Sequence, residues 1–273
     1  MFRAPENRTK ARTFFAMSEV VYHSIVRNLR SGHRNAVVGI VLDILQSLVM
    51  VAVFLVMFLL LGLRSSPIRG DYLLYVMSGI FMYMTHIKTV AAIAGAGNPV
   101  GGMMQHAPMN PIISIAAAAF STLYKQIVAV FVILTVYHIV FTPITIHDPV
   151  AALGMILMAW FFGIAVGMIF LALNPWIPDF AGVVRMLYIR VNMIASGKMF
   201  LANTLPASMV AMFDWNPLFH IIDQARGAIF LHYNPYVTSI MYPIYVSLAL
   251  IMLGLMGEFY TRKSVSVSWT AAR

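Results

Sequence analysis

The chain has 273 residues, of which 61% are hydrophobic and only 10% charged, and its mean hydropathy is +0.84. Soluble domains carry about 25% charged residues, so this composition excludes a soluble protein and indicates an integral membrane protein. The formal net charge is +9. Most basic residues flank apolar runs, as membrane orientation requires, and we expect no nucleic-acid partner. The sequence contains no cysteine, which excludes disulfide and thiol chemistry.

Residues 1–35 are predicted to form a basic cytoplasmic region. They lack the short apolar core and small-residue cleavage site of a removable signal peptide. One helical face carries the apolar residues Phe14, Met17, Val21, Ile25 and Leu29, while charged residues occupy another face. This pattern predicts an amphipathic helix in the cytoplasmic interface of the membrane. The helix either anchors the topology or also offers a docking surface for a cytoplasmic partner.

Six apolar stretches are long enough to cross a bilayer, which takes about 20 residues. They cover residues 36–63, 72–96, 112–141, 150–173, 180–201 and 237–260, and the fifth is the weakest. Basic residues gather before the first stretch and after the sixth, so both termini are predicted to be cytoplasmic. The sequence therefore predicts one all-α membrane domain over 1–273, with six spans in 36–260 and a cytoplasmic tail at 261–273.

Three charged residues lie inside the first three predicted spans, where charge is costly. Asp43 is in the first span, Lys88 in the second and Lys125 in the third. We interpret Asp43 and Lys125 as side chains that reach an interface, and Lys88 as an internal polar contact. In the fourth span, Gly163 and Gly167 form a small-xxx-small motif that is typical of close helix packing.

The loop between the second and third predicted spans is cytoplasmic by this topology and rich in Gly and Pro. It is either a plain connecting loop or a short element on which a partner protein acts mechanically. The part expected to form one or two helical turns is Gly101, Gly102, Met103, Met104, Gln105, His106 and Ala107.

The fifth span carries polar groups along one helical face. The residues recur every three or four positions: Arg185, Tyr188, Asn192, Ser196 and Met199. They either bond to neighbouring helices or form the wall of a hydrophilic translocation path, and the added charges of Arg190 and Lys198 favour the path.

The stretch NPLFHIIDQARGAIF, residues 216–230, is predicted to be a helix too short to span the membrane. Fifteen residues rise about 23 Å, whereas the hydrocarbon core is about 30 Å thick. Asn216-Pro217 suits a helix start, and an Asp223–Arg226 pair is expected on its polar face, which also includes His220. We interpret the segment as part of a re-entrant hairpin between spans five and six on the periplasmic side, beside a pathway.

The sequence predicts no enzyme and no cofactor. It has no Walker loop, no HExxH and no GxSxG motif, and its histidines are scattered rather than grouped as a metal site requires.

The order of these features resembles the polysaccharide exporters among the type 2 permeases of ABC transporters. The resemblance covers nearly the whole chain. It rests on Arg34-Asn35-Ala36 with Gly39, on Asp179, on Ser196-Gly197, and above all on Asn216-Pro217-Leu218 with His220 and Arg226. The family often has Arg before the aspartate that opens span five, where this chain has Pro178.

The resemblance implies a permease homodimer in the bacterial inner membrane with two copies of a separate ATPase subunit. The substrate would be a capsular polysaccharide or a lipid-linked O-antigen-like glycan, passed on to periplasmic export components. Gly101–Ala107 would be the coupling helix, and Asn216, Pro217, His220, Asp223 and Arg226 would belong to the outer gate. Aromatic surfaces for sugar rings would be Phe54, Phe58, Tyr75, Tyr188 and Phe200.

Three other readings stay open. The chain can be a type 2 ABC exporter of a drug or lipid. It can be an ion-coupled secondary carrier that uses Asp43 and Lys88, although its acidic residues are few. It can also be a membrane enzyme acting on lipid-linked sugars, although the sequence has no catalytic cluster for that chemistry.

Overall fold

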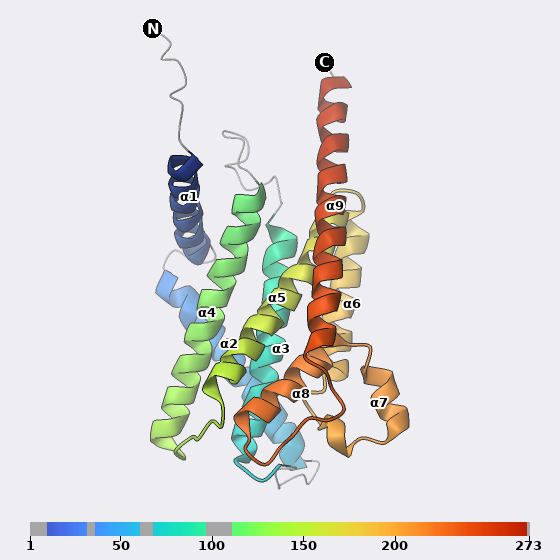
Figure 1. The fold of residues 1–273 in the computed structure, drawn as a ribbon. Helices are drawn as coiled ribbons and strands as arrows, with labels where there is room; N and C mark the ends of the chain where they lie inside the picture. The colour runs from blue at the N-terminus through green and yellow to red at the C-terminus, as the bar shows by residue number, and fades with distance from the viewer. Residues whose placement is uncertain (1–9, 32–35, 61–67, 97–110, 272–273) are drawn as a thin grey trace.

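The structure is a computed structural model that describes residues 10–31, 36–60, 68–96 and 111–271. Every regular element in these ranges is helical (Figure 1). The elements are α1 (Lys10–Ser31), α2 (Ala36–Leu60), α3 (Tyr72–Gly95), α4 (Pro111–Val140), α5 (Pro149–Leu173), α6 (Pro178–Ala195), the 3-10 turn η1 (Ala202–Thr204), α7 (Ala207–Phe213), α8 (Pro217–Ile229) and α9 (Met241–Ala271). The predicted all-α fold is confirmed.

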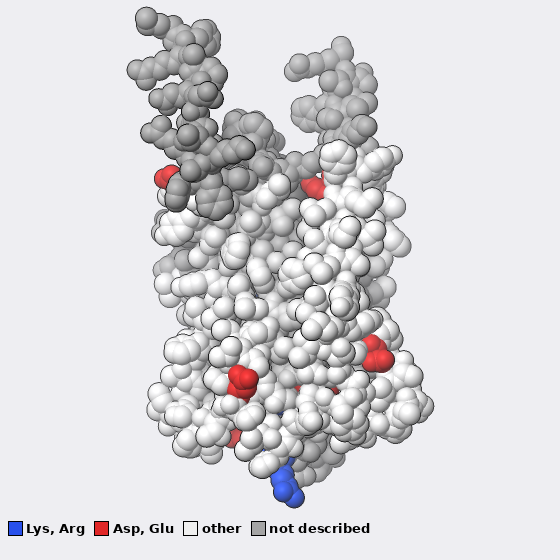
Figure 2. All heavy atoms as spheres, viewed as in Figure 1, with Lys and Arg blue, Asp and Glu red and all other residues white. Residues whose placement is uncertain are grey.

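Five helices are long and apolar enough to cross a membrane: α2, α3, α4, α5 and α9. The start of each lies within four residues of the predicted start. Figure 2 shows a broad belt across the middle of one face in which the described residues carry no charged side chain, with charged atoms above and below it. This is the surface pattern expected where a protein meets lipid.

The fifth predicted span corresponds to α6, which is not among these five helices. It has 18 residues and therefore rises about 27 Å, slightly less than a hydrocarbon core. Even so, α6 carries the chain from the end of the bundle where α5 finishes to the opposite end, where α7 and α8 lie (Figure 1). Because of this return, α1 and the last turns of α9 lie at the same end of the molecule.

The end of α6 is set by Gly197. Its φ of +73° lies in the left-handed region, and a Cβ there would meet Cδ2 of Phe219 at 2.5 Å. Glycine adopts this conformation without strain, whereas other residues do not. The ring of Phe219 in α8 therefore packs directly on the backbone that follows α6.

Helix α3 forms the centre of the bundle and packs against α2, α4, α5, α6 and α8. The small-xxx-small prediction for α5 is confirmed, because a Cβ on Gly163 would come within 2.8 Å of Thr89, and one on Gly167 within 2.7 Å of Ile93. Close approach of α5 to α3 thus depends on these two glycines.

The amphipathic helix predicted before the first span is present as α1, which packs against α4 and α2. Val21 and Ile25 are half-buried, while Glu19, His23 and Arg27 are exposed. The helix therefore keeps its apolar side toward the protein and its charged side away from it.

The segment between α6 and α9 is a helical hairpin of α7 and α8 at the end of the bundle opposite α1 (Figure 1). The predicted helix start is confirmed: Pro217 is the first residue of α8, and Asn216 caps it by accepting a hydrogen bond from the N–H of Leu218 at 3.1 Å. Helix α8 packs against α3 and α5 and is buried on nearly all sides.

Candidate functional site

A buried polar junction joins the end of α6 to the start of α8. The Nδ2 of Asn216 donates to Oδ1 of Asn192 at 2.9 Å and to the carbonyl oxygen of Ala195 at 3.0 Å. Asn192 in turn donates to the carbonyl of Tyr188 at 3.0 Å. Since both asparagines are 2% exposed, these bonds form inside the protein, where an unpaired amide would be costly.

Arg226 is the largest fully buried side chain among the described residues, and it belongs to the same junction. Its guanidinium donates to the carbonyl oxygens of Gly197 at 3.0 Å, Lys198 at 2.6 Å and Phe200 at 2.6 Å. It also lies over the ring of Tyr75, 4.3 Å from the centroid. Arg226 therefore holds the chain that follows α6 against both α8 and α3.

The expected Asp223–Arg226 pair is wrong, since no ion pair within 4.0 Å joins these two described residues. Asp223 instead accepts hydrogen bonds from the hydroxyl of Tyr233, and from Thr238 at 2.8 Å. The physical reason is that backbone carbonyls after α6 take up the guanidinium, while hydroxyl donors after α8 take up the carboxylate. Burial and the nearby Asp223 carboxylate raise the pKa of Tyr233, which keeps its hydroxyl a donor.

His220 closes the α7–α8 hairpin. Its Nδ1 accepts from the N–H of Ser239 at 3.0 Å, which leaves Nε2 to donate to the carbonyl of Asp214 at 2.8 Å. The Asp214 carboxylate lies 3.1 Å from the same nitrogen. His220 thus links the turn before α8 to the segment that leads into α9.

Lys198 places a cation among aromatic rings with no hydrogen-bond partner for its Nζ among the described residues. The Nζ atom lies 3.4 Å from the centroid of the Tyr83 ring and 4.7 Å from that of Phe54. Lys198 comes this close to α3 because Gly79 lacks a Cβ, which would otherwise lie 2.8 Å from the Cβ of Lys198. Burial lowers the pKa of Lys198 to about 7, and cation–π attraction is the electrostatic interaction that favours its protonated form here.

The polar face of α6 faces the interior of the protomer. Asn192 and Ser196 are buried, and Arg185, Tyr188 and Met199 are half-buried. Tyr188 bonds to His86 at 2.8 Å. The opposite face of α6 is exposed and mostly apolar, and it also carries Arg190; its apolar residues are Val183, Met186, Leu187, Val191 and Ile194. In this conformation the stripe bonds to neighbouring helices, and whether it lines a path stays a prediction.

The charged residues of the first three predicted spans meet at one place between α2, α3 and α4. The Nζ of Lys88 lies 2.5 Å from Asp43, and that of Lys125 lies 3.9 Å from it. The interpretation of Lys88 as an internal polar contact is confirmed. Asp43 and Lys125 serve this contact rather than reaching an interface alone, because each is only about a fifth exposed.

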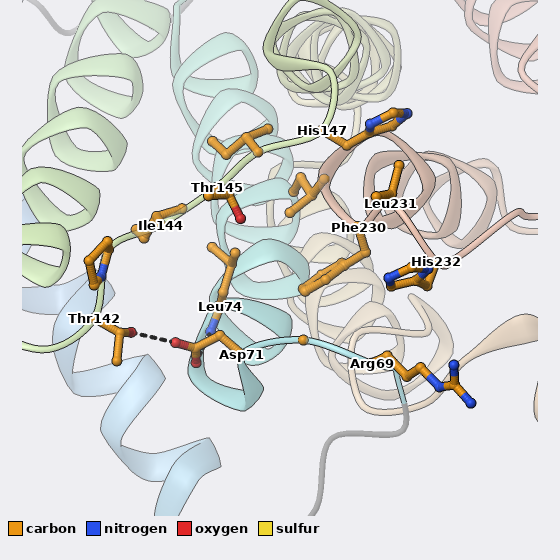
Figure 3. A pocket seen from close by; sticks show the side chains of 14 residues that line it. Arg69, Asp71, Leu74, Thr142, Ile144, Thr145, His147, Phe230, Leu231 and His232 are labelled. Carbon is orange, nitrogen blue, oxygen red and sulfur yellow. Dashed lines mark hydrogen bonds between the residues drawn. The ribbon is translucent and has the colours of Figure 1, made fainter.

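A cavity of about 530 Å³, lined by both polar and apolar side chains, opens at the α8 end of the bundle (Figure 3). Asp71, the N-cap of α3, lies on one side of it and accepts from Tyr137 at 2.5 Å and Thr142 at 2.7 Å. Burial raises the pKa of Asp71, but bonds from these hydroxyls and from the N–H groups of Leu73 and Leu74 outweigh it, so the pKa lies below its ordinary value.

The sequence analysis missed this cavity. The available signal was Asp71 immediately before an apolar run, which is typical of a helix N-cap. Its partners lie 66 and 71 residues further along the chain, a separation that no local pattern reports.

The structure places the remaining residues of the sequence analysis, the proposed coupling segment and the aromatic surfaces, as follows. Gly101–Ala107 and Phe58 lie outside the residues whose side chains the structure describes. Tyr75 and Phe54 are buried inside the protomer, and Phe200 packs against Phe213, with ring centroids 5.0 Å apart. Within the described ranges no three His, Asp or Glu side chains come together as metal ligands would.

Neither a protein-family model nor a curated protein matches this sequence.

Proposed function

We propose that this chain is the membrane-spanning permease subunit of an ATP-driven exporter that moves a polysaccharide across the bacterial inner membrane. The cargo is a capsular polysaccharide or a lipid-linked O-antigen-like glycan. In this proposal α6 also crosses the membrane, as the fifth of six spans, both termini are cytoplasmic, and two copies of the chain form the channel. An exporter of a drug or lipid with the same architecture is the alternative.

The observation that carries the proposal is the placement of α8. Arg226 of α8 reaches Tyr75, only three residues after the start of α3, and Gly79 of α3 approaches Arg226 and Lys198 one turn deeper. Seven residues of α3 correspond to about 10 Å of depth. A helix that enters a membrane without crossing it survives only where protein or a water-filled path supports it. This is the arrangement expected of a re-entrant outer gate.

In this mechanism the gate residues act by position. Asn216 and Pro217 start α8, His220 ties it to α9, and Arg226 ties it to the end of α6. The polar residues from Arg185 in α6 to Met199 just after it become accessible to cargo when this junction opens. No covalent chemistry is needed in the permease itself.

ATP hydrolysis is assigned to a separate ATPase subunit, present in two copies. The proposed contact is the segment Gly101–Ala107, which belongs to the stretch between α3 and α4 that lies outside the described residues. The exposed apolar face of α6 and the exposed residues of α2 offer surfaces on which a second copy packs. Periplasmic export components are expected to receive the cargo.

The test is reconstitution. The chain is purified with the ATPase that copurifies with it and is placed in vesicles. ATP-dependent entry of glycan into inverted vesicles is then measured. Substituting Met104 and His106 together with Asp should abolish glycan movement while the chain stays folded and the ATPase keeps hydrolysing. Glycan movement that continues without any ATPase subunit would refute the proposal.

A second candidate function is an ion-coupled secondary carrier, and the Asp43–Lys88–Lys125 group favours it. Carriers use buried ionisable groups of this kind. In that case Asp43→Asn should abolish transport driven by an ion gradient in vesicles that contain no ATP. In the exporter proposal the same variant affects folding or ATP-driven transport only.

A further inference from the structure

Two hollows on the molecule adjoin each other. The cavity of Figure 3 and a second, apolar groove of about 310 Å³ share Leu74, Ile146 and Ile229 in their walls. The groove runs between α3, α4 and α5, and apart from Ser78 its lining residues have no polar side chain. The hydroxyl of Ser78 is already used, because it donates to the carbonyl of Tyr75 at 2.7 Å.

The groove extends from the cavity into the membrane level of the bundle. Along α3 its walls run from Leu74 to Met82, and along α5 from Pro149 to Ile156. Eight residues of helix rise about 12 Å, which is close to half of a hydrocarbon core about 30 Å thick. The groove thus has the depth of one leaflet. It is open at the surface, where Phe131 is 70% exposed and Leu153 is 46% exposed.

The cavity lies at the membrane boundary, because it forms where α4 ends, α5 begins and α3 begins. Figure 3 shows two unlike sides. Asp71 and Thr142 lie on one side, bonded to each other, and His147, Leu231 and His232 lie on the other, with Arg69 at the rim. Each imidazole carries an N–H donor even when neutral, and the guanidinium carries five.

The carboxylate oxygens on the acidic side of this cavity already have donors within the protein. The carboxylate of Asp71 already accepts bonds from Tyr137, Thr142 and the N–H of Leu73, and it caps the positive end of α3. By contrast, no hydrogen bond or ion pair to another described residue engages the side chains of Arg69, His147 or His232. The free donors of the cavity are therefore the cationic guanidinium and the two imidazoles.

We propose that this two-part hollow binds one phospholipid of the leaflet on the α8 side of the membrane. The phosphate of the headgroup accepts hydrogen bonds from Arg69 and His232, which lie on the same side of the cavity (Figure 3). One acyl chain lies in the groove against α3, α4 and α5. The shared walls of the two hollows, the leaflet depth of the groove, and the change from mixed to apolar walls at the membrane boundary each match a lipid rather than a small anion. This site is separate from the α6–α8 junction and does not depend on the exporter proposal.

The test uses the full chain in detergent micelles and native mass spectrometry, with phosphatidylglycerol titrated in. One lipid should remain bound. The double variant Arg69→Gln with His232→Gln should bind the lipid on the order of tenfold more weakly, because it loses charge-assisted bonds to the phosphate. Both positions are exposed. Leu153→Trp should reduce it similarly by filling the groove. Leu157→Trp is the matched control, since Leu157 is also exposed on α5 but does not line the groove, and it should bind normally.

Two further ligands distinguish binding of a phospholipid from binding of its acyl chains alone or of phosphate alone. Diacylglycerol with identical chains should bind at least tenfold more weakly, and millimolar inorganic phosphate should not displace the bound phosphatidylglycerol. Equal retention of lipid by all variants would overturn the proposal. So would equal binding of diacylglycerol, or displacement of the lipid by phosphate alone, because each would remove one half of the two-part site.

Discussion

Asn216 and Asn192 are joined inside the protein by a hydrogen bond of 2.9 Å, although 24 residues separate them in the chain. Asn216 also caps α8 and bonds to the last turn of α6. One amide side chain thus fixes where α8 starts and how far it lies from α6.

Asn216→Ala should destabilise the protein by about 2 kcal/mol or more. The change removes a helix cap, worth about 1 kcal/mol, and leaves the Asn192 carbonyl group buried without its partner. Thermal unfolding in detergent measures the loss. Asn203→Ala is the control, because Asn203 donates one hydrogen bond, to Asn234, near the surface. Equal unfolding temperatures for the two variants would contradict the role given to Asn216.

Arg226→Lys should be nearly as damaging as removal of the charge. The guanidinium reaches three carbonyl oxygens in different directions, which a single ammonium on a flexible stem does not reproduce. Disrupting a buried charge of this kind costs about 3–5 kcal/mol. Arg190→Lys, at an exposed position of α6, should change stability by about 0.5 kcal/mol or less. Urea or thermal unfolding measures the stability of both variants. If Arg226→Lys is as stable as Arg190→Lys, the carbonyl contacts do not carry the role given to them.

Gly197→Ala should prevent α8 from docking in its present position. The new Cβ would meet the ring of Phe219 at 2.5 Å in a backbone conformation that disfavours alanine. The cost of such overpacking is about 1–3 kcal/mol. Gly182→Ala is the matched control on α6, since nothing lies within 4 Å of its Cβ position, and it should be neutral or slightly stabilising. Equal unfolding temperatures for Gly197→Ala and Gly182→Ala would show that the ring of Phe219 moves aside at little cost.

Asp71 should make stability depend on pH in the acid range. Its pKa in the folded protein lies below the ordinary 3.8. The stabilisation is therefore complete above the unfolded pKa and is lost as pH falls through the folded value. Between about pH 5 and pH 3 the wild type should lose more stability than Asp71→Asn, measured by thermal unfolding. Tyr137→Phe, which removes one hydrogen bond to the carboxylate, should show an intermediate slope, and identical slopes would contradict the assignment.

Cysteine labelling tests whether the polar face of α6 borders a path. Because the native chain has no cysteine, single cysteines report without background. Asn192→Cys and Ser196→Cys should be protected from a water-soluble thiol reagent at rest, because both positions are buried. The exporter proposal expects both to react during ATP-driven transport. Labelling of Leu187→Cys on the exposed face, with continued protection of the other two, would place any water-filled path on the opposite side of α6.

The spanning helices were predictable because their signal is local. An apolar run long enough to cross a bilayer is visible in any window of about 20 residues, and α2 and α5 begin within one residue of expectation. The fifth span ends six residues early, since Gly197 turns the chain where the sequence analysis continued the helix to Leu201.

The polar contacts were not predictable in the same way. Periodicity places His220, Asp223 and Arg226 on one face of α8, but it does not say whether water, a side chain or a carbonyl faces them. Arg226 binds carbonyls 26 to 29 residues earlier in the chain, and Asp43 meets Lys88 across 45 residues. Such pairs depend on tertiary packing, which a single sequence does not report.

The two ends of α8 are held differently, and this determines how the hairpin can swing. At its last turn, the N–H of His147 donates to the carbonyl of Ile229 at 3.1 Å, and that of Asp148 to Ala228 at 2.8 Å, which fixes this end to the start of α5. At its first turn, Asn216 is bonded to α6 and to nothing in α3. Opening at the first turn would therefore break the hydrogen bonds of Asn216 to Asn192 and Ala195, because α6 is itself tied to α3 through Tyr83 and His86. The last turn of α8, at Ala228–Ile229, would be the pivot of that motion.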